Sequence, residues 1–288
     1  MAANTRDIRR RIKSIKNTAQ ITKAMQMVAA AKMRRAQQAA LAGREYAAKL
    51  NEVLADLKKR ADSLLHPLLE VREVKKELVL VISTDKGLCG ALNTNLLREI
   101  PKFDTAKTSY ITSGRKGVQY LHRTKRTIVA DFPLQDNFKV ADAKAISKFM
   151  IEKFLSGEFD KISVLYTKFV NTLSQVPTTV TLLPIAAGKL DEKAEAEKAA
   201  GALTDYTYEP SPTSVLGVVL PQYIHFEVYQ MLLDSRASEQ SARMVAMKSA
   251  TDNAKQLIKD LTLEYNKIRQ AAITTQLLEI STAQMALG

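Results

Sequence analysis

The residues that most often carry chemistry are few in this chain and lie far apart. The histidines are His66, His122 and His225, and the single cysteine is Cys89. Metal sites bring His and Cys ligands together at short, regular spacings, which this sequence lacks. No Ser or Cys stands in a nucleophile motif. The sequence therefore predicts no catalytic residues, no metal site and no disulfide, and we assign these four residues ordinary structural roles.

A glycine-containing turn, Ser83 to Gly90, follows directly after an apolar run. It lacks the GK[ST] of a phosphate-binding P-loop and the spacing of a dinucleotide fingerprint. Such a turn is more typical of a connection between a strand and a helix. We therefore expect no cofactor to be bound there.

The net charge of +13 is concentrated at one end of the chain. Residues 1–60 hold 15 Lys and Arg against four acids, so they carry +11, and residues 61–288 contribute only +2. This asymmetry indicates an acidic partner, which could be nucleic acid, anionic lipid or a protein surface. No run of 18 apolar residues and no apolar signal-peptide core is present, so we expect neither a membrane span nor secretion by that route.

Apolar residues near both ends recur at alternating spacings of three and four. The longer set is Met244, Met247, Thr251, Ala254, Ile258, Leu261, Tyr265, Ile268 and Ala272. The shorter set is Ile8, Ile12, Ile15 and Ala19, after which the stripe drifts to Ile21, Met25 and Val28. This spacing is that of a coiled-coil seam, which requires a partner helix. We therefore expect the two ends of the chain to pair with each other.

Residues 75–186 are predicted to form a central α/β domain. Apolar runs with the length and composition of strands are separated by helical stretches such as Val140 to Leu155. The runs are Leu78 to Ile82, Thr108 to Thr112, Thr127 to Val129, Lys161 to Val170 and Val176 to Ile185. Alternation of strand and helix implies a mostly parallel sheet. The last run follows a short polar turn, so we expect it to add an antiparallel edge strand.

The N-terminal part, residues 1–60, is predicted to be a nearly continuous helix. It contains no proline and only Gly43 as a weak point, and at 1.5 Å a residue a helix from about residue 5 to residue 57 would extend roughly 80 Å. Residues 187–210 form a charged, low-complexity segment whose composition is that of a linker.

The C-terminal part, residues 211–288, is predicted to be a helix of roughly 115 Å. Ser211 and Pro212 supply an N-cap and a first-turn proline, and Pro221 is expected to kink or interrupt the helix. Because both long helices join the same domain, they most simply run antiparallel as a stalk. The C-terminal helix would then overhang its partner by roughly 35 Å.

The predicted overhang is almost uncharged. Residues 270–288 carry a single charge, on Glu279. Its large apolar residues are distributed around the helix: Ile273, Leu277, Leu278, Ile280, Met285 and Leu287. A helix that is apolar all round is normally enclosed. We therefore expect other subunits to surround this tip.

Four segments resemble the gamma subunit of F-type ATP synthases. They are ITKAMQMVAAAKMRRAQ at 21–37, STDKGLCGALN at 83–93, ASEQSARMVAMKSATDNA at 237–254 and YNKIRQAAIT at 265–274. The resemblance runs along the whole chain, and the order of helix, α/β domain and helix agrees with that family. At the tip, Gln276 and Ala283-Gln284-Met285 depart from the glutamate and the glycine-alanine run that are usual there.

The resemblance implies a fold and a role. The fold would be a Rossmann-like α/β domain with a mostly parallel sheet, joined to a long antiparallel coiled coil of the N- and C-terminal helices. The role would be that of a non-catalytic rotor without a cofactor, which couples rotation of the c-ring to conformational cycling of the catalytic beta subunits. It would lie peripherally on the cytoplasmic face of a bacterial inner membrane, or on the matrix face in an organelle.

The resemblance also implies partner-binding residues. Four match positions at or beside the contact with the catalytic subunits: Met25, Arg243, Gln270 and Thr274. Basic residues of the first helix would face the ring of alpha and beta subunits: Arg9, Arg10, Lys23, Lys32, Arg34 and Arg35. Tyr206, Tyr208 and Glu209 match the foot that contacts the c-ring and the epsilon subunit, in the segment whose composition suggests a linker.

Two other classes of protein remain as alternatives. A nucleic-acid-binding protein with a basic helical arm would explain the pI of about 9.6. However, the arm offers one aromatic residue for stacking, Tyr46, and the central domain shows no recognition motif. An enzyme built on the α/β domain would need an acid, base or nucleophile constellation, which the sequence lacks.

Overall fold

The computed structural model describes residues 2–60, 66–135, 138–185, 207–209 and 211–287. The chain falls into two compact units. The first unit combines residues 1–30 with residues 243–288, and the second unit spans residues 31–242. The two longest helices, α1 (Ala2–Ala42) and α7 (Pro212–Leu287), each contribute to both units.

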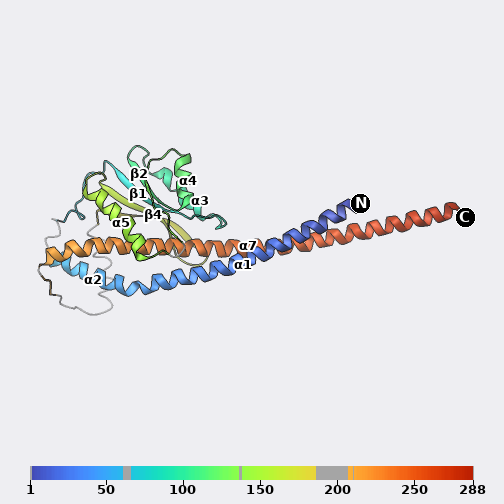
Figure 1. The fold of residues 1–288 in the computed structure, drawn as a ribbon, viewed down its shortest axis with the longest axis horizontal. Helices are drawn as coiled ribbons and strands as arrows, with labels where there is room; N and C mark the ends of the chain where they lie inside the picture. The colour runs from blue at the N-terminus through green and yellow to red at the C-terminus, as the bar shows by residue number, and fades with distance from the viewer. Residues whose placement is uncertain (1, 61–65, 136–137, 186–206, 210, 288) are drawn as a thin grey trace. The chain divides into compact units, whose positions relative to one another are not determined.

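The second unit contains an α/β domain with a five-stranded sheet (Figure 1). Its strands are β1 (Glu77–Ile82), β2 (Thr108–Ser113), β3 (Ile128–Asp131), β4 (Lys161–Phe169) and β5 (Gln175–Leu183). Its helices are α2 (Arg44–Arg60), α3 (Leu92–Leu97), the 3-10 turn η2 (Ile100–Lys102), α4 (Arg115–Arg123) and α5 (Val140–Leu155). The five predicted strands and the predicted helix at Val140 to Leu155 are therefore confirmed.

The strand order is β3-β2-β1-β4-β5. Strand β1 is parallel to both of its neighbours, and β2 is parallel to β3. Strand β5 is antiparallel to β4 and lies at the edge. The prediction of a mostly parallel sheet with an antiparallel edge strand is confirmed. In such a sheet the carboxyl ends of β1, β2 and β4 meet at one edge.

Both faces of the sheet are covered, which explains the unbroken apolar run of β1. Because successive side chains point to opposite faces, Leu78 and Leu80 join one core while Val79 and Val81 join the other. The larger core includes residues of α2, α5 and α7, and the smaller core includes residues of α3 and α4. The segment of α7 in the second unit is therefore part of the α/β domain's own core.

Local sequence explains where the long helices begin and break. The nearly continuous helix predicted for the N-terminal part is interrupted at its predicted weak point, Gly43, where an added Cβ would meet Gln230 and Phe226. Ser211 caps α7, because its Oγ accepts a hydrogen bond from the Ser214 amide at 3.2 Å.

The interruption expected at Pro221 is absent, since α7 runs through it as one helix. Leu220 and Ile224 on either side are fully buried in the larger core. Tertiary packing therefore holds the helix across the position where proline removes one backbone hydrogen bond.

Candidate partner-binding surfaces

In the first unit, α1 and α7 pair as an antiparallel coiled coil (Figure 1). The Arg9 guanidinium donates a hydrogen bond to the Tyr265 hydroxyl at 2.7 Å, and the Thr22 and Thr251 hydroxyls are also 2.7 Å apart. Between these two contacts the residue number rises along α1 and falls by nearly the same amount along α7. The predicted pairing of the two chain ends is confirmed.

Burial along α7 follows the predicted seam. Every predicted member from Met244 to Ala272 is buried or half-buried, with Met247, Thr251 and Ala254 the most enclosed. On α1 the predicted members Ile8, Ile12, Ile15 and Ala19 are likewise enclosed.

The continuation of the α1 stripe was predicted incorrectly. Ile21 and Val28 are 60% and 55% exposed, whereas Thr22 and Ala29 are buried. The seam keeps its heptad spacing through Thr22 and Ala29, so a polar threonine occupies a position that an apolar pattern misses. Ile21 and Val28 instead place apolar side chains on the outer face of the helix pair.

In this register, no helix of the described residues pairs with the C-terminal tip of α7. Because Arg9 lies beside Tyr265, the start of α1 extends only to about residue 272 of α7. About 15 residues of α7, or about 22 Å, therefore project beyond it. The overhang of roughly 35 Å expected from helix lengths is too long, because lengths alone do not fix the register of two helices.

The tip is apolar and exposed, as the sequence predicts. Four large side chains in its last three turns are between 62% and 80% exposed: Leu277, Leu278, Ile280 and Met285. Ile273 is 47% exposed, and the side chain of Leu287 lies outside the described residues. Exposed apolar residues that are contiguous along a helix mark a surface that binds another protein.

The four residues matched to the catalytic contact lie in two separate places. Met25 and Arg243 are half-buried and fall within about 12 Å, along the helix axis, of the Thr22–Thr251 contact. Gln270 and Thr274 are exposed and lie about 28 and 35 Å further along α7 from Thr251. Thr274 donates a hydrogen bond to the Gln270 carbonyl at 3.0 Å.

The predicted basic residues are divided between the two units. In the first unit Arg9, Arg10 and Lys23 are exposed, with Arg9 held against Tyr265 and Arg10 lying 3.9 Å from Asp7. The others belong to the second unit, where Arg34 and Arg35 are exposed and Lys32 is half-buried.

The predicted foot is described in part. Tyr206 lies outside the described residues. Tyr208 is half-buried and packs against the larger core, and its hydroxyl donates a hydrogen bond to the Asp56 carboxylate of α2 at 2.9 Å. Glu209 is exposed. The contact with α2 was not foreseen, since no local pattern links residues so far apart in sequence.

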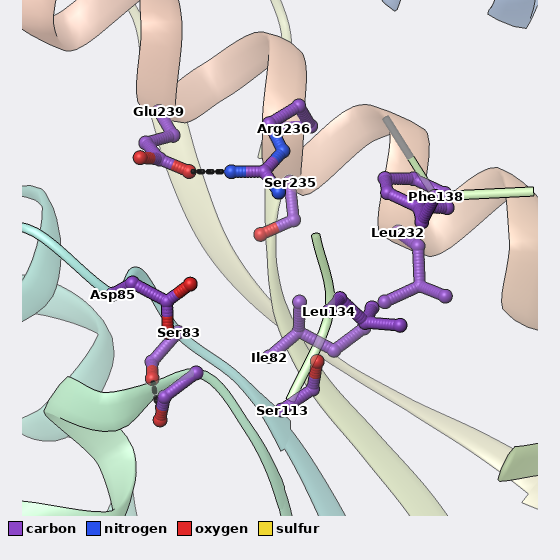
Figure 2. A pocket seen from close by; sticks show the side chains of 11 residues that line it. Ile82, Ser83, Asp85, Ser113, Leu134, Phe138, Leu232, Ser235, Arg236 and Glu239 are labelled. Atoms are coloured by element: carbon purple, nitrogen blue, oxygen red, sulfur yellow. Dashed lines mark hydrogen bonds and ion pairs between the residues drawn. The ribbon is translucent and has the colours of Figure 1, made fainter. Parts of the chain in front are cut away.

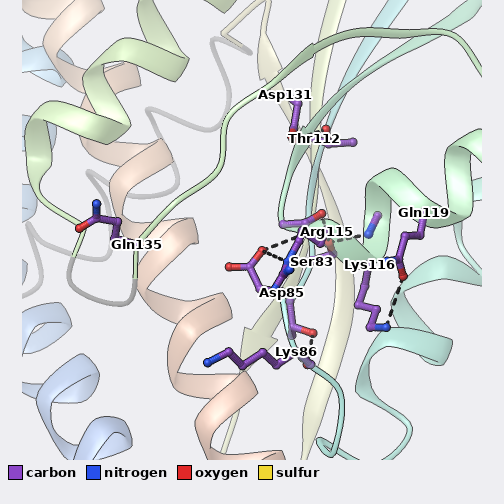
Figure 3. Close-up of polar contacts among 12 residues, drawn as sticks. Ser83, Asp85, Lys86, Thr112, Arg115, Lys116, Gln119, Asp131 and Gln135 are labelled. Carbon is purple, nitrogen blue, oxygen red and sulfur yellow. Dashed lines mark hydrogen bonds and ion pairs between the residues drawn. The ribbon is translucent and has the colours of Figure 1, made fainter.

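The turn after β1 caps helix α4 with its own side chains (Figure 3). The Asp85 carboxylate accepts a hydrogen bond from the Arg115 amide at 3.0 Å, and Ser83 Oγ accepts one from the Gly117 amide at 2.7 Å. These groups occupy the amides that bind phosphate at a helix N-terminus in nucleotide-binding folds. The turn connects β1 to α3, which confirms its predicted role as a strand-to-helix connection.

Two of the histidines are shielded from solvent. His225 of α7 is 8% exposed, and its Nδ1 lies 2.6 Å from the Ser147 hydroxyl of α5. Burial lowers the pKa of His225, and the positive charge of Lys144 lowers this pKa further. Burial also lowers the pKa of His66, whose Nδ1 accepts a hydrogen bond from the Leu68 amide at 3.2 Å. Both rings therefore favour the neutral form, in keeping with structural roles.

Among the described residues, no helix combines the length and the apolar character needed to cross a bilayer. Within the same residues, no three His, Cys, Asp or Glu side chains are grouped so that they could hold a metal ion.

Comparisons with known proteins point to one family. A family model described as ATP synthase matches residues 4–287. The chain is 54% identical to the ATP synthase gamma chain of Methylacidiphilum infernorum, over 99% of this chain and 100% of that one. It is 48% identical to the ATP synthase gamma chain of Opitutus terrae, over 99% of each.

Solved structures agree with these relatives. The Tetrahymena thermophila mitochondrial ATP synthase central stalk and c-ring structure contains a chain of 26% identity, with a TM-score of 0.61 over 80% of this chain and 99% of that one. A chain of the Euglena gracilis mitochondrial ATP synthase, in a structure of OSCP, F1 and c-ring, has the same fold, with 19% identity and a TM-score of 0.71 over 100% of this chain and 95% of that one. The chain described here belongs to the family of ATP synthase gamma chains.

Proposed function

We propose that this chain is the central-stalk rotor of a rotary ATP synthase, coupling proton-driven rotation of a c-ring to the conformational cycle of catalytic beta subunits. Membership of the gamma-chain family supports this role. The observation that carries it is the antiparallel helix pair of the first unit, which ends in an exposed apolar tip on α7.

A helix pair has the mechanical properties that a shaft needs. Two helices locked by a heptad seam resist twisting better than a single helix does. A single pair inside a threefold ring of alternating alpha and beta subunits is also necessarily asymmetric. Each catalytic site would therefore meet a different face of the shaft, and turning the shaft would change which site is open through differences in contact energy.

The alpha and beta subunits would contact the surfaces described above. The apolar tip would sit in an apolar collar, where few directional bonds need to break during rotation. The exposed Arg10, Lys23, Arg34 and Arg35 would meet acidic side chains of the ring. Met25 with Arg243, and Gln270 with Thr274, would serve as two separate contact points along the shaft.

The foot would contact the c-ring and the epsilon subunit. Tyr208 is hydrogen-bonded to Asp56, and the neighbouring Glu209 is exposed and would be available to a partner. Tyr206 completes this part of the proposal on the basis of family resemblance alone. The chain itself would catalyse no reaction and would bind no cofactor. It would be peripheral to the membrane, on the cytoplasmic face in a bacterium or on the matrix face in an organelle.

The nucleic-acid alternative receives no comparable support. Tyr46, the aromatic residue of the basic arm, packs against Phe226 with ring centroids 5.2 Å apart. The Arg9 guanidinium lies 5.5 Å from the centre of the Tyr265 ring and is bonded to its hydroxyl. Both side chains therefore already have partners within the chain.

The proposal is tested by adding the purified chain to alpha and beta subunits and measuring ATP hydrolysis. The chain alone should hydrolyse no ATP, whereas the assembled complex should do so and should rotate a probe attached to the second unit. Activity of the alpha and beta subunits that is unchanged by the chain would contradict the proposal. A salt titration with duplex DNA serves as the control, for which we expect weak and sequence-independent binding.

A further inference from the structure

A small cavity lies in the second unit, where the carboxyl ends of β1 and β2 face α7 (Figure 2). Its volume is about 30 Å³. One water molecule needs roughly 10–15 Å³ on the same measure, so the cavity has room for more than one water. Ile82, Leu134, Phe138 and Leu232 form its apolar wall. In open α/β folds, the carboxyl ends of the strands are the usual place for a ligand.

Two serine hydroxyls point into this cavity from different elements. Ser113 ends β2 and is 3% exposed, and Ser235 of α7 is 6% exposed. Figure 2 shows both side chains directed toward the space between the sheet and α7. Neither hydroxyl has a hydrogen-bond partner among the described residues. Because the cavity reaches solvent, water can bond to both hydroxyls, and an occupant that bonds to both would take the place of that water.

A carboxylate faces the same space. Oδ1 of Asp85 is engaged by the Arg115 amide, but Oδ2 accepts no hydrogen bond from the described residues. The carboxylate is 32% exposed, so the cavity reaches solvent beside it. An occupant that donates a hydrogen bond to Oδ2 would complete the polar side of the cavity.

The lining selects against charged ligands. Asp85 lies 4.0 Å from the Arg115 guanidinium, and Glu239 lies 3.0 Å from the Arg236 guanidinium, so the local charges balance. The amides at the start of α4, which would attract an anion, are already bonded to Asp85, Ser83 and the Thr84 carbonyl. A neutral ligand with hydroxyl groups and a short carbon chain fits both the polar and the apolar walls.

We propose that this cavity is a binding site for a small neutral polyol of two or three carbons. One hydroxyl donates to Asp85, another exchanges hydrogen bonds with Ser113 and Ser235, and the carbon chain contacts Leu134 and Leu232. The occupant bridges α7 to the ends of β1 and β2, and so strengthens the packing of α7 on the sheet. This site goes beyond the rotor function and does not depend on it.

The test is a titration of the complete chain with ethylene glycol, followed by NMR of its Ile and Leu methyl groups. Methyl signals of Ile82, Leu134 and Leu232 should shift and reach saturation, while those of Ile100 and Leu121 in the smaller core should not. Shifts that grow linearly and equally in both cores would overturn the proposal, since they report only a change of solvent.

Variants and a second probe make the test specific. Ser113→Ala and Ser235→Ala should each weaken binding about fivefold, because each removes one hydrogen bond. Ser156→Ala is the matched control, because its exposed hydroxyl bonds to the Lys153 carbonyl outside the cavity, and binding should be unchanged. Saturable binding of inorganic phosphate in place of the glycol would overturn the assignment. A crystal soaked in ethylene glycol that shows only ordered water in the cavity would also overturn it.

Discussion

The hydroxyl groups of Thr22 and Thr251 lie 2.7 Å apart across the seam between α1 and α7. Both side chains are more than nine-tenths buried, among otherwise apolar seam positions. Thr251 can also donate to the Met247 carbonyl at 2.8 Å and Thr22 to the Ala19 carbonyl at 3.1 Å, so either hydroxyl can be the donor across the seam. A polar pair inside a coiled-coil seam satisfies its hydrogen bonds in one alignment of the helices and so fixes their register.

The first prediction concerns this pair. Thr251→Val should destabilise the chain by about 1 kcal/mol, because Thr22 loses its partner across the seam. The double variant Thr22→Val with Thr251→Val should regain most of that stability, since two apolar side chains of similar shape fill the seam. Urea unfolding of the wild type, both single variants and the double variant measures the coupling free energy, which should be close to 1 kcal/mol. Additive effects would mean that the hydroxyls do not interact.

The register itself provides a second readout for the double variant. Spin labels at the exposed positions Lys16 and Leu257 should give one narrow distance distribution in the wild type. In the double variant the distribution should broaden, because an apolar seam tolerates more than one alignment. An unchanged distribution would show that other contacts are sufficient to fix the register.

The second prediction concerns the hydrogen bond and cation–π contact between Arg9 and Tyr265. Tyr265→Phe removes the hydrogen bond but keeps the ring below the guanidinium, whereas Tyr265→Leu removes both interactions. Hydrogen exchange at the start of α1 should therefore accelerate slightly in the first variant and more in the second. The expected loss of local stability at the start of α1 is below about 1 kcal/mol, because the contact is exposed. Arg10→Gln is the control and should leave exchange unchanged, since the contact of Arg10 with Asp7 is exposed.

The third prediction compares two glycines with positive φ. Gly114 has φ +108°, and a Cβ there would overlap the carbonyl oxygen of Ser83. Gly157 has φ +74°, and a Cβ there would meet open space. Gly157→Ala should therefore lower the free energy of unfolding by about 1 kcal/mol, because of the backbone conformation alone. Gly114→Ala should cost clearly more, because the backbone at the start of α4 must move. Equal losses in thermal or urea unfolding would contradict this reading.

The α/β domain was predictable because its signals are local. The unbroken apolar run of β1 and the short turn before β5 are patterns of neighbouring residues, and the predicted strands match within a few positions. The coiled coil was predictable for a similar reason, since its heptad spacing persists over many turns of α7. Pro221 was misjudged because the buried residues beside it, which hold the helix, belong to a core assembled from distant segments.

The tertiary contacts that fix the register of the coiled coil, the position of Tyr208 and the lining of the cavity could not be predicted. Thr22 was missed since a threonine does not count in an apolar pattern, although its partner Thr251 was recognised as a seam member. The overhang was overestimated because the register depends on pairs such as Arg9 and Tyr265, which are far apart in sequence. The hydrogen bond from Tyr208 to Asp56 and the cavity between Ser113 and Ser235 arise in the same way, from tertiary packing that local propensity does not encode.

The fourth prediction concerns pH. The pKa of His225 is lowered in the folded chain by burial and by Lys144, so the unfolded chain binds a proton more readily. Stability should therefore be fully present above the ordinary histidine pKa of about 6.5 and should fall as the pH decreases below it. Unfolding free energies measured in urea between pH 5 and pH 8 test this direction.

Two histidine variants separate the sources of this dependence. His225→Asn should flatten part of the decline, and His66→Asn should flatten another part, because burial lowers the pKa of both side chains. His122 is exposed, so His122→Asn serves as the control and should preserve the wild-type profile. A profile that is unchanged in the His225 variant would show that its protonation is not linked to folding.

The fifth prediction concerns the tip of α7 and separates folding from assembly. Leu277→Gln and Ile280→Gln change side chains that are 62% and 64% exposed, so the melting temperature of the isolated chain should stay the same. In a complex with alpha and beta subunits, the same side chains would be enclosed, so both variants should lower the thermal stability of the complex and its coupled ATP synthesis. Leu261→Gln is the contrasting variant, because its half-buried seam position predicts that the isolated chain is destabilised. Two outcomes would argue against burial of the tip by the alpha and beta subunits. One is a tip variant that lowers the melting temperature of the isolated chain, and the other is a tip variant that leaves the thermal stability of the complex unchanged.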